Sequence, residues 1–412
     1  MKEYKIIKKC RICGSKNLHK FLDFGQMSLA NNFLTDDELN RVEARYPLYC
    51  LFCANCGLVQ LGVVVNPRIM FCNYPYIPSG SGVMMNNFAS LAYEVGKRMK
   101  FGEKSLVIDI GSNDGTLLTF FKKMGTRILG VDPAKNLSRM AQLSGVPTVT
   151  KLFNRQTAKS LVNKYGKADL VLATNVVAHI DDLYDFLRGV STMLGSRGLF
   201  ICEFPYVLDL IARNQFDTIY HEHLSYFALL PWSRIVSRLD FEIVDVARLS
   251  IHGGSLRLTH KKKSGTRRSK AVDYLVALER RHGLYDVATY EAFAKRIEGL
   301  GEKLKLVLGD FKTRGKRIIG LGAAAKGNVL TNFFDIGGDI LDYIADSTPY
   351  KWGLYTPGKH IAIYPEERVE FDLPDFGLIL AWNFANEIMR KHQQFKKRGG
   401  KFIIPIPEVK II

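Results

Sequence analysis

Short apolar runs alternate with polar, glycine-containing loops along most of the chain. From Leu106 to Asp132 an apolar run is followed by a glycine loop, an amphipathic stretch and a second apolar run that ends on an acid. Short apolar runs bounded by turn residues are typical of buried parallel strands. The pattern therefore predicts a strand–loop–helix–strand unit, on which nucleotides and related cofactors bind.

The alternation continues after Asp132 and predicts an α/β protein. A helix is expected before the unit, at 84–99. Further strands are expected at 147–152, 168–180 (running into a loop) and 198–204, with helices at 155–164 and 182–194 and an antiparallel hairpin at 240–262. A helical pattern follows at 274–314. A second strand–glycine loop–helix–strand signal then spans 316–346, before short strands at 378–382 and 401–407 and a helix at 386–398.

The glycine loop of the first unit narrows the choice of cofactor. It reads Asp109-x-Gly111-x-Asn113-x-Gly115, whereas a dinucleotide site requires GxGxxG. Gly111 and Gly115 would let the backbone approach a ligand closely, and Asp132 could accept hydrogen bonds from ribose hydroxyls. Acids at positions 109 and 114 repel a pyrophosphate but suit the ammonium and sulfonium groups of S-adenosylmethionine. We therefore favour S-adenosylmethionine over a dinucleotide.

Length and composition are those of a soluble globular protein. The 412 residues predict two or three domains. No apolar run reaches the roughly eighteen residues of a membrane span, and the N-terminus lacks the apolar core of a secretion signal, which predicts a cytoplasmic protein without a membrane partner. The net charge of +18 suits an anionic partner such as a phosphate-bearing substrate, although a general lysine bias explains it equally well.

Four of the seven cysteines form two matched pairs, each followed by glycine. They are Cys10, Cys13, Cys53 and Cys56. Two CxxCG knuckles predict a tetrahedral structural zinc site with no open position for catalysis. The residues between the knuckles, 14–52, must form an inserted loop or small subdomain. Cys50 is a spare thiol.

Two further stretches, one before and one after the first glycine loop, carry candidate chemistry. The loop from Cys72 to Gly82 is rich in tyrosine, proline and glycine and is either a cover for the cofactor pocket or a plain connector. Asn175 and His179 follow an apolar run, and ligands of open α/β sheets bind at such strand ends. The loop there reads Thr-Asn-Val-Val, which disfavours methylation of nucleic-acid amino groups.

The sequence Tyr220-His221-Glu222-His223 places four proton-active side chains in a row. In a helical turn Tyr220 and His223 would share a face, and in a strand His221 and His223 would. Proton chemistry is the favoured interpretation, with structural hydrogen bonding and a metal site as alternatives. In the second glycine loop, Lys326 could meet a phosphate, or that unit could be purely structural.

Taken together, the motifs resemble the sugar C-methyltransferases that act on nucleotide-linked keto-deoxysugars. The resemblance spans the whole chain and rests on these motifs in order: CRICG, CANCGLVQL, YPYIPSGS, DIGSNDG, NVVAHI, EFPY, YHEHLSYF, HGGSLR, GAAAKGN and IADSTPYKWG. It implies a zinc-binding domain (1–70), a class I S-adenosylmethionine-dependent methyltransferase domain (71–265) and a C-terminal Rossmann-like domain (266–412).

The resemblance also implies a reaction. A base removes the proton next to a keto group, and the enolate takes the methyl group. By motif, His223 would be the base, Glu222 would orient it or share in proton transfer, and Tyr220 and His179 would donate hydrogen bonds to the enolate. Tyr76 would lie near the sugar or the methyl donor. The C-terminal loop from Gly322 to Asn328, with Lys326, would reach the nucleotide diphosphate.

Two other functions remain open from the sequence. A sugar O-methyltransferase would use a similar base but no keto group. A nucleic-acid-binding zinc protein would suit the net charge and the two knuckles, but aromatic residues are not interleaved with the basic cluster from His260 to Lys270, so a nucleic-acid partner is not expected.

Overall fold

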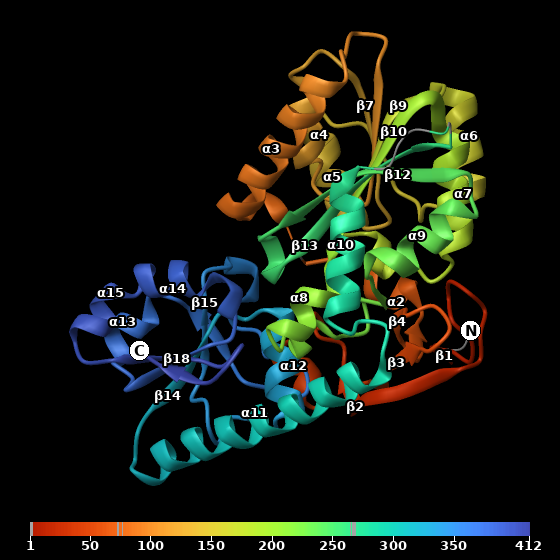
Figure 1. Ribbon diagram of the computed structural model, residues 1–412. Helices are drawn as coiled ribbons and strands as arrows, with labels where there is room; N and C mark the ends of the chain where they lie inside the picture. The colour runs from red at the N-terminus through yellow and green to blue at the C-terminus, as the bar shows by residue number, and fades with distance from the viewer. Residues whose placement is uncertain (1–2, 72–73, 76, 264, 266–268) are drawn as a thin grey trace.

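The computed structural model describes residues 3–71, 74–75, 77–263, 265 and 269–412. Figure 1 shows a large central lobe, an N-terminal sheet on one side of its base and a C-terminal lobe on the other. The short 3₁₀ turns are η1 (Pro78–Gly80), η2 (Val177–His179), η3 (Phe216–Thr218), η4 (Ile251–Gly253), η5 (Pro349–Lys351) and η6 (Trp382–Phe384).

The central lobe is built on a seven-stranded sheet with the order β12-β13-β10-β9-β6-β7-β8. Its strands are β6 (Leu106–Ile110), β7 (Arg127–Val131), β8 (Thr148–Val149), β9 (Ala168–Thr174), β10 (Leu194–Pro205), β12 (Phe241–Leu249) and β13 (Ser255–Lys262). Strand β13 is antiparallel to both neighbours, and the other pairs are parallel. The predicted strands and the closing hairpin are confirmed, and the fold is that of a class I methyltransferase.

Helices cover both faces of this sheet because its strands are apolar on both sides. Val107, Leu170 and Ile201 pack on one face with α3 and α4, whereas their neighbours Ile108 and Val171 belong to the core of the other face. The helices of this lobe are α3 (Gly82–Arg98), α4 (Thr116–Lys122), α5 (Lys135–Leu143), α6 (Arg155–Tyr165), α7 (Leu183–Met193), α8 (Val207–Ala212) and α9 (Leu229–Ser237). The sheet order reverses between β6 and β9, and ligands of such sheets bind at that switch point.

The N-terminal sheet includes a strand from the middle of the chain. Its order is β11-β4-β3-β2, and its strands are β2 (Leu18–Ser28), β3 (Arg45–Cys53), β4 (Val59–Leu61) and β11 (Ser225–Tyr226). A separate pair is formed by β1 (Tyr4–Ile6) and β5 (Val63–Val65). The helices of this region are α1 (Asp36–Leu39) and α2 (Pro67–Phe71). The expected insertion between the knuckles is therefore a β-hairpin. Because β11 pairs with β4, this sheet holds the chain just after His223.

The C-terminal lobe is a second Rossmann-like sheet with the order β16-β15-β14-β17-β18-β19. Its elements are β14 (Ile318–Leu321), α12 (Ala325–Phe333), β15 (Ile344–Asp346), β16 (Ile363–Pro365), α13 (Arg368–Asp372), β17 (Phe376–Ile379), α14 (Ala385–Lys391), α15 (Gln393–Lys397), β18 (Lys401–Ile404) and β19 (Lys410–Ile411). Its switch point lies between β14 and β17, so the loops after these two strands share one edge.

The helical pattern at 274–314 forms two helices rather than one, α10 (Lys270–Arg281) and α11 (Val287–Thr313). Gly283 has a φ of +64° at the break between them. Helix α10 packs on β12 and α9 of the central lobe, whereas α11 packs along β2. Figure 1 shows α11 running beneath the molecule from the N-terminal sheet to the C-terminal lobe, which ties the three parts together.

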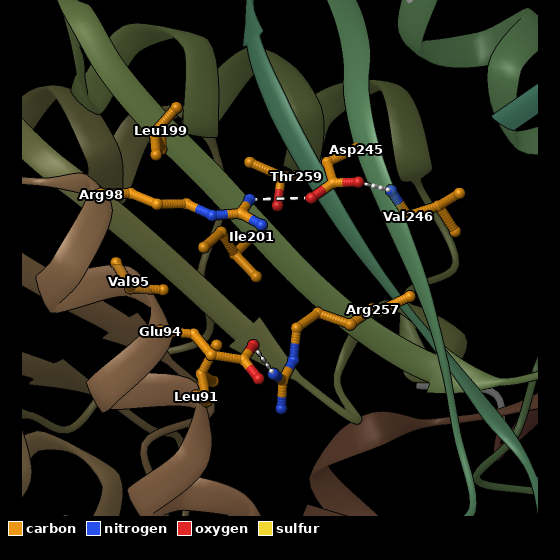
Figure 2. Close-up of a pocket in the computed structure, with 11 residues that line it drawn as sticks. Leu91, Glu94, Val95, Arg98, Leu199, Ile201, Asp245, Val246, Arg257 and Thr259 are labelled. Atoms are coloured by element: carbon orange, nitrogen blue, oxygen red, sulfur yellow. Dashed lines mark hydrogen bonds and ion pairs between the residues drawn. The ribbon is translucent and has the colours of Figure 1, made fainter. Parts of the chain in front are cut away.

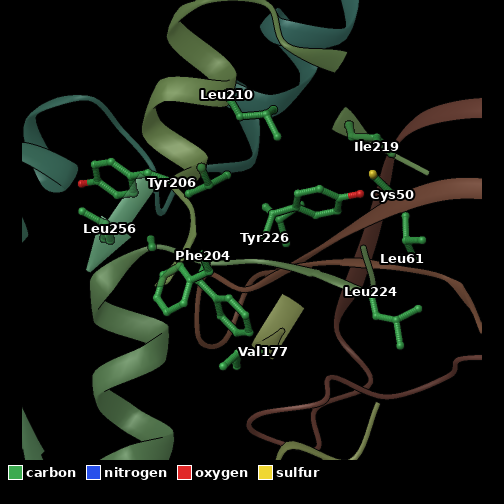
Figure 3. Close-up of a cluster of buried hydrophobic side chains, with 14 of the residues drawn as sticks. Cys50, Leu61, Val177, Phe204, Tyr206, Leu210, Ile219, Leu224, Tyr226 and Leu256 are labelled. Atoms are coloured by element: carbon green, nitrogen blue, oxygen red, sulfur yellow. The ribbon is translucent and has the colours of Figure 1, made fainter. Parts of the chain in front are cut away.

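The turn that carries His223 is anchored by apolar residues on both sides. Ile219 precedes the turn and Leu224 follows it, and both side chains are almost fully buried. Figure 3 shows them near Cys50 and Leu61 of the N-terminal sheet, in the same cluster as Phe204 of β10. Burial of these flanking residues fixes where the polar turn can lie.

In the part of the chain that the structure describes, no helix combines the length and apolar character needed to cross a membrane.

Candidate active site

Residues 220–223 form a tight turn, which is neither the helix nor the strand considered from the sequence. The backbone N–H of His223 donates to the carbonyl of Tyr220 over 2.9 Å, and the two rings lie 4.2 Å apart between centroids. The turn thus gives Tyr220 and His223 a shared face, as a helical turn would. His221 lies apart from them: its Nε2 is 3.3 Å from the carbonyl oxygen of Tyr46.

His223 is held in one tautomer by the backbone. Its Nδ1 lies 2.7 Å from the carbonyl oxygen of Thr218. A carbonyl can only accept, so Nδ1 carries the proton and Nε2 keeps a free lone pair. Burial, with the nearby His179 ring, lowers the pKa of His223 well below its usual value. The imidazole is therefore neutral and able to take a proton at Nε2.

His179 packs against His223, with ring centroids 5.0 Å apart. Burial lowers the pKa of His179 to about 4, so this ring too is neutral. Its Nδ1 is buried and has no hydrogen-bond partner among the described residues. The structure thus brings three of the predicted site residues, His179, Tyr220 and His223, into one cluster.

Glu222 belongs to a different set of contacts. Asn31 donates to one of its carboxylate oxygens over 2.7 Å, and the Tyr74 hydroxyl donates to the other over 2.8 Å. Burial raises the pKa of Glu222 to about 7. The orienting contact on His223, which the resemblance gave to Glu222, is made by Thr218 instead, because the turn directs the two side chains to different neighbours.

Tyr76 lies outside the described residues. Its neighbours on the loop are fixed from two directions. Asn136 donates to the carbonyl of Tyr74 over 2.8 Å, and the Tyr350 hydroxyl of the C-terminal lobe donates to the carbonyl of Pro75. This part of the loop therefore bridges the central and C-terminal lobes.

The first glycine loop presents acidic groups at the switch point of the central sheet. Asp132 accepts from the N–H groups of Asn113 (2.9 Å) and Ala134 (2.8 Å). Asp109 lies buried on β6, and its Oδ1 has no partner among the described residues. Burial, together with Asp132 and Glu203, raises the pKa of Asp109 to about 8. Such a carboxyl favours a cationic ligand, because a positive charge would restore its ionised form.

The packing of the loop itself requires glycine at two positions. Gly111 (φ +70°) and Gly115 (φ +79°) are both left-handed. A Cβ on Gly111 would lie 2.3 Å from Cγ2 of Val176, and one on Gly115 would lie 2.9 Å from Cβ of Val146. Both glycines therefore make room for the protein's own valines, and the close approach of a ligand to this loop stays a prediction.

The helix that follows the loop is already capped by the protein. A carboxylate oxygen of Asp114 accepts from the backbone N–H of Thr116, at the start of α4, over 3.1 Å. A dinucleotide would place its pyrophosphate at this helix N-terminus, where the Asp114 carboxylate would repel it. The structure thus agrees with the preference for S-adenosylmethionine.

A groove of about 740 Å³ adjoins the acidic loop. It is lined by Pro133 and Lys135, next to Asp132, by the segment after β8 with the start of α6, and by α2 of the N-terminal region. Ligand pockets in proteins are typically of this size. On the other side of Asp109, Asn175 adopts a left-handed conformation (φ +57°), and its side-chain oxygen is buried without a partner among the described residues. Unpaired acceptors at Asp109 and Asn175 fit the ammonium group of S-adenosylmethionine.

A second, much smaller pocket lies between α3 and the sheet (Figure 2). At about 40 Å³ it has room for little more than a water molecule. Arg257 crosses it and pairs with Glu203 (2.6 Å) and Glu94 (3.0 Å), while Arg98 pairs with Asp245 (2.8 Å). These ion pairs clamp α3 to the sheet rather than form a ligand site.

The four predicted metal ligands come together. The Sγ atoms of Cys10, Cys13, Cys53 and Cys56 all lie within 4.8 Å of one another. A tetrahedral zinc with Zn–S bonds near 2.3 Å places its sulfurs about 3.8 Å apart, so the cluster is compatible with zinc. Cys50 is buried and lies outside the cluster.

Arg11, which lies between Cys10 and Cys13, links the cysteine cluster to the turn that carries His223. The buried Arg11 guanidinium pairs with Asp181 (3.2 Å) and donates to the carbonyls of Leu61 (2.9 Å) and Leu224 (3.1 Å). Asp181 follows His179 by two residues, and Leu224 follows His223 directly. Arg11 therefore holds both imidazole-bearing segments against the cysteine cluster.

The sequence predicted that Lys326 and Asn328 of the C-terminal lobe contact the substrate. Of these two residues, only Lys326 reaches the cluster of His179 and His223. Its Nζ donates to the carbonyl of His252 over 3.3 Å, and its charge contributes to the lowered pKa of His223. Asn328 is instead buried in α12 and donates to the carbonyl of Ala30 over 2.7 Å. Its amide joins the C-terminal lobe to the N-terminal region, and its contact with the substrate stays a prediction.

His252 was missed by the sequence reasoning. It lies in the turn between β12 and β13 with a φ of +54°, ahead of two left-handed glycines. Burial and Lys326 lower the pKa of His252 to about 4, and its imidazole acts electrostatically on His223. The His-Gly-Gly sequence was the available signal, because such a turn requires positive φ values.

Comparisons with known proteins identify the family to which the chain is similar. Family models match in three stretches: "Putative zinc binding domain" (residues 10–71), "Methyltransferase domain" (88–246) and "C-methyltransferase C-terminal domain" (250–407). The C-methyltransferase NovU of Streptomyces niveus is 34% identical over 407 residues, which cover 98% of this chain and 97% of that protein.

Two other likenesses are partial. A ubiquinone biosynthesis O-methyltransferase of Methylobacterium sp. (strain 4-46) is 34% identical over 98 residues, 23% of this chain and 38% of that protein. The crystal structure of magnesium protoporphyrin IX methyltransferase from Synechocystis PCC 6803 with bound SAM matches at 16% identity and a TM-score of 0.33, covering 44% of this chain and 79% of that one.

Proposed function

The chain belongs to the family of the C-methyltransferase NovU and is an S-adenosylmethionine-dependent C-methyltransferase, and from this premise we propose that its substrate is a nucleoside-diphosphate-linked keto-deoxysugar. Methylation at carbon requires a carbanion-like nucleophile, and a keto group next to that carbon makes its proton removable. The cluster of neutral imidazoles with Tyr220 suits a ketone. The net charge of +18 suits the diphosphate.

The observation that carries the proposal is the fixed tautomer of His223. Nε2, with its free lone pair, takes the proton from the carbon next to the keto group, and the electron pair of that C–H bond moves to the keto oxygen. The imidazolium that forms stays bonded to Thr218 through Nδ1. Tyr220 and His179 donate hydrogen bonds to the oxygen where negative charge develops, and each such donor typically contributes about 10²–10³ in rate.

The remaining site residues support the two cofactors. Asp109, Asn113, Asp132 and Asn175 would hold S-adenosylmethionine at the switch point, with Gly111 and Gly115 shaping the loop. When bound, S-adenosylmethionine supplies an electrophilic methyl group to the deprotonated carbon and leaves as S-adenosylhomocysteine. Zinc on the four clustered cysteines would act structurally, because thiolates fill all four positions.

The test uses labelled S-adenosylmethionine and a panel of nucleotide-linked keto-sugars. The wild-type protein should label a keto-sugar at carbon. His223→Ala should keep its affinity for S-adenosylhomocysteine, measured by calorimetry, while losing turnover. Undiminished turnover in His223→Ala would remove His223 from the role of base. Label on a hydroxyl oxygen, or on no member of the panel, would refute the keto-sugar assignment.

A further inference from the structure

The ligand-binding edges of the two sheets meet at the catalytic turn. The switch point of the C-terminal sheet lies between β14 and β17. Lys326 lies at the start of α12, which follows β14, and Trp382 begins η6, which follows β17. Trp382 Nε1 donates to Asp217 Oδ2 over 2.5 Å. Helix α12, which carries Lys326, packs on η3, where Asp217 and Thr218 lie. The second sheet therefore presents its own ligand edge to the residues that hold His223.

Two consecutive residues of η3 act on Lys326 and on His223. The carboxylate of Asp217 attracts the ammonium of Lys326 electrostatically, and the backbone carbonyl of Thr218 accepts the hydrogen bond from His223. Adjacent Cα atoms are only about 3.8 Å apart, so the group that attracts the lysine and the group that holds the base are neighbours in one turn. The contact of Lys326 with the His252 carbonyl fixes the ammonium from the side of the central lobe.

The environment of Lys326 suits a fixed charge better than a mobile phosphate clamp. Its Nζ lies 4.9 Å from the ring centroid of Trp382, and its side chain is largely enclosed. Nearby, Asp217 Oδ1 and Thr218 Oγ1 are buried without hydrogen-bond partners among the described residues. This part of the cluster thus retains polar groups that the protein itself does not satisfy, as expected where a ligand binds.

The position of Lys326 indicates which end of the substrate it would meet. In a nucleotide-linked keto-sugar the diphosphate is separated from the reacting carbon by the sugar ring. A cation anchored next to the base lies at the reacting end, where negative charge appears only as the proton leaves. An ammonium already in place at that point stabilises the transition state more than the bound substrate.

We propose that Lys326 stabilises the enolate oxygen, so that the C-terminal sheet supplies a catalytic residue and not only contacts to the nucleotide. This inference rests on the proposed keto-sugar substrate, and it replaces the diphosphate contact expected for Lys326 from the sequence. The step it assists is the proton transfer to His223 Nε2 described above, and it needs no further reactant.

The test measures enolate formation separately from methyl transfer. The full-length protein is incubated in deuterated buffer, without S-adenosylmethionine, with a thymidine-diphosphate-linked keto-deoxyhexose, and deuterium incorporation next to the keto group is followed. Lys326→Gln keeps a donor for the His252 carbonyl but removes the charge, and should slow incorporation about 10²–10³-fold. Lys326→Arg should restore most of the rate. Inhibition by free thymidine diphosphate should change less than about threefold.

Two controls separate catalysis from folding. Lys351→Met removes another enclosed lysine from the same edge of the C-terminal sheet. Lys351 donates to the Ala323 carbonyl over 2.8 Å and pairs with Asp346 over 3.6 Å. The rate of deuterium incorporation in this variant should stay within about threefold of the wild-type rate. Asp217→Asn combined with Lys326→Gln removes both charges together, avoids a buried unpaired carboxylate and should be as slow as Lys326→Gln alone.

The outcomes that overturn the inference are distinct from failure of the proposed function. Unchanged incorporation in Lys326→Gln, with incorporation present in the wild type, would refute the role of Lys326 alone. Loss of thymidine diphosphate inhibition with incorporation retained at saturating substrate would make Lys326 a phosphate ligand. Absence of incorporation by the wild-type protein with every keto-sugar tested would refute the keto-sugar substrate itself.

Discussion

Replacing Gly111 by alanine tests whether the glycine loop is shaped by the protein's own side chains. The new Cβ would lie 2.3 Å from Cγ2 of Val176, at a φ of +70°. The left-handed conformation costs a non-glycine residue roughly 1–2 kcal/mol, and overpacking costs about 1–3 kcal/mol. The free energy of unfolding should therefore fall by about 2–5 kcal/mol, and affinity for S-adenosylhomocysteine should fall with it.

Gly125 provides the matched control. It has a similar φ of +78°, but no atom lies within 4 Å of the Cβ it would gain. The free energy of unfolding of Gly125→Ala should thus fall only by the cost of the left-handed backbone conformation, about 1–2 kcal/mol. Adding Val176→Ala to Gly111→Ala should recover most of the remaining difference, giving a coupling of about 1–3 kcal/mol in a double-mutant cycle.

The assay is urea denaturation of the wild type, Gly111→Ala, Gly125→Ala, Val176→Ala and the Gly111→Ala/Val176→Ala double variant. Calorimetry measures the affinity of each protein for S-adenosylhomocysteine. The reasoning would be refuted if Gly111→Ala were no less stable than Gly125→Ala. It would be refuted equally if removal of the Val176 side chain brought no recovery, because the contact would then not be the cause.

Two further predictions concern the metal and pH. Cys53→Ser should lower both the zinc content and the melting temperature, because zinc closes a long loop. Cys50→Ser is the control, because Cys50 lies outside the cluster, and this variant should keep its zinc. Elemental analysis measures the zinc, and equal zinc in both variants would contradict a four-cysteine site. Buried histidines, among them His179 and His252, have pKa values lowered to about 4 from an unfolded value near 6.5. At these two rings the unfolded chain binds more protons below pH 6.5, so the stability that they contribute above that pH should be lost as the pH falls from about 6.5 through about 4. The carboxyl groups of Asp109 and Glu222, whose pKa values are raised to about 8 and about 7, act in the opposite direction. The measurement is therefore the NMR titration of each imidazole in the folded protein, and a midpoint near 6.5 for either ring would contradict its lowered pKa.

The features that sequence predicted well are those set by local pattern. Most strands of the central and C-terminal sheets follow from apolar runs, and the cysteine cluster follows from two matched knuckles. Asp132 was expected at the end of its strand and lies there. In each case the residues that determine the feature are near one another in the chain or share a fixed spacing, so periodicity is enough to find them.

The features that sequence did not predict depend on contacts between distant segments. The partners of Glu222 lie 191 and 148 residues away, at Asn31 and Tyr74, and no local pattern connects them. Thr218 was missed because its backbone, not its side chain, holds His223. The packing requirement at Gly111 was not predicted because Val176, which fills the space beside it, belongs to the loop after another strand.

The bridge made by Arg11 and β11 has a consequence for engineering this protein. A chimaera that joined its methyltransferase and C-terminal regions to a foreign zinc domain would replace Arg11 and strand β4, and with them the supports of Asp181 and Leu224. The grafted protein could bind its metal and its methyl donor and still misplace the imidazoles. Exchange of parts between relatives should therefore treat the first sixty-odd residues and the segment around 178–226 as one inherited unit.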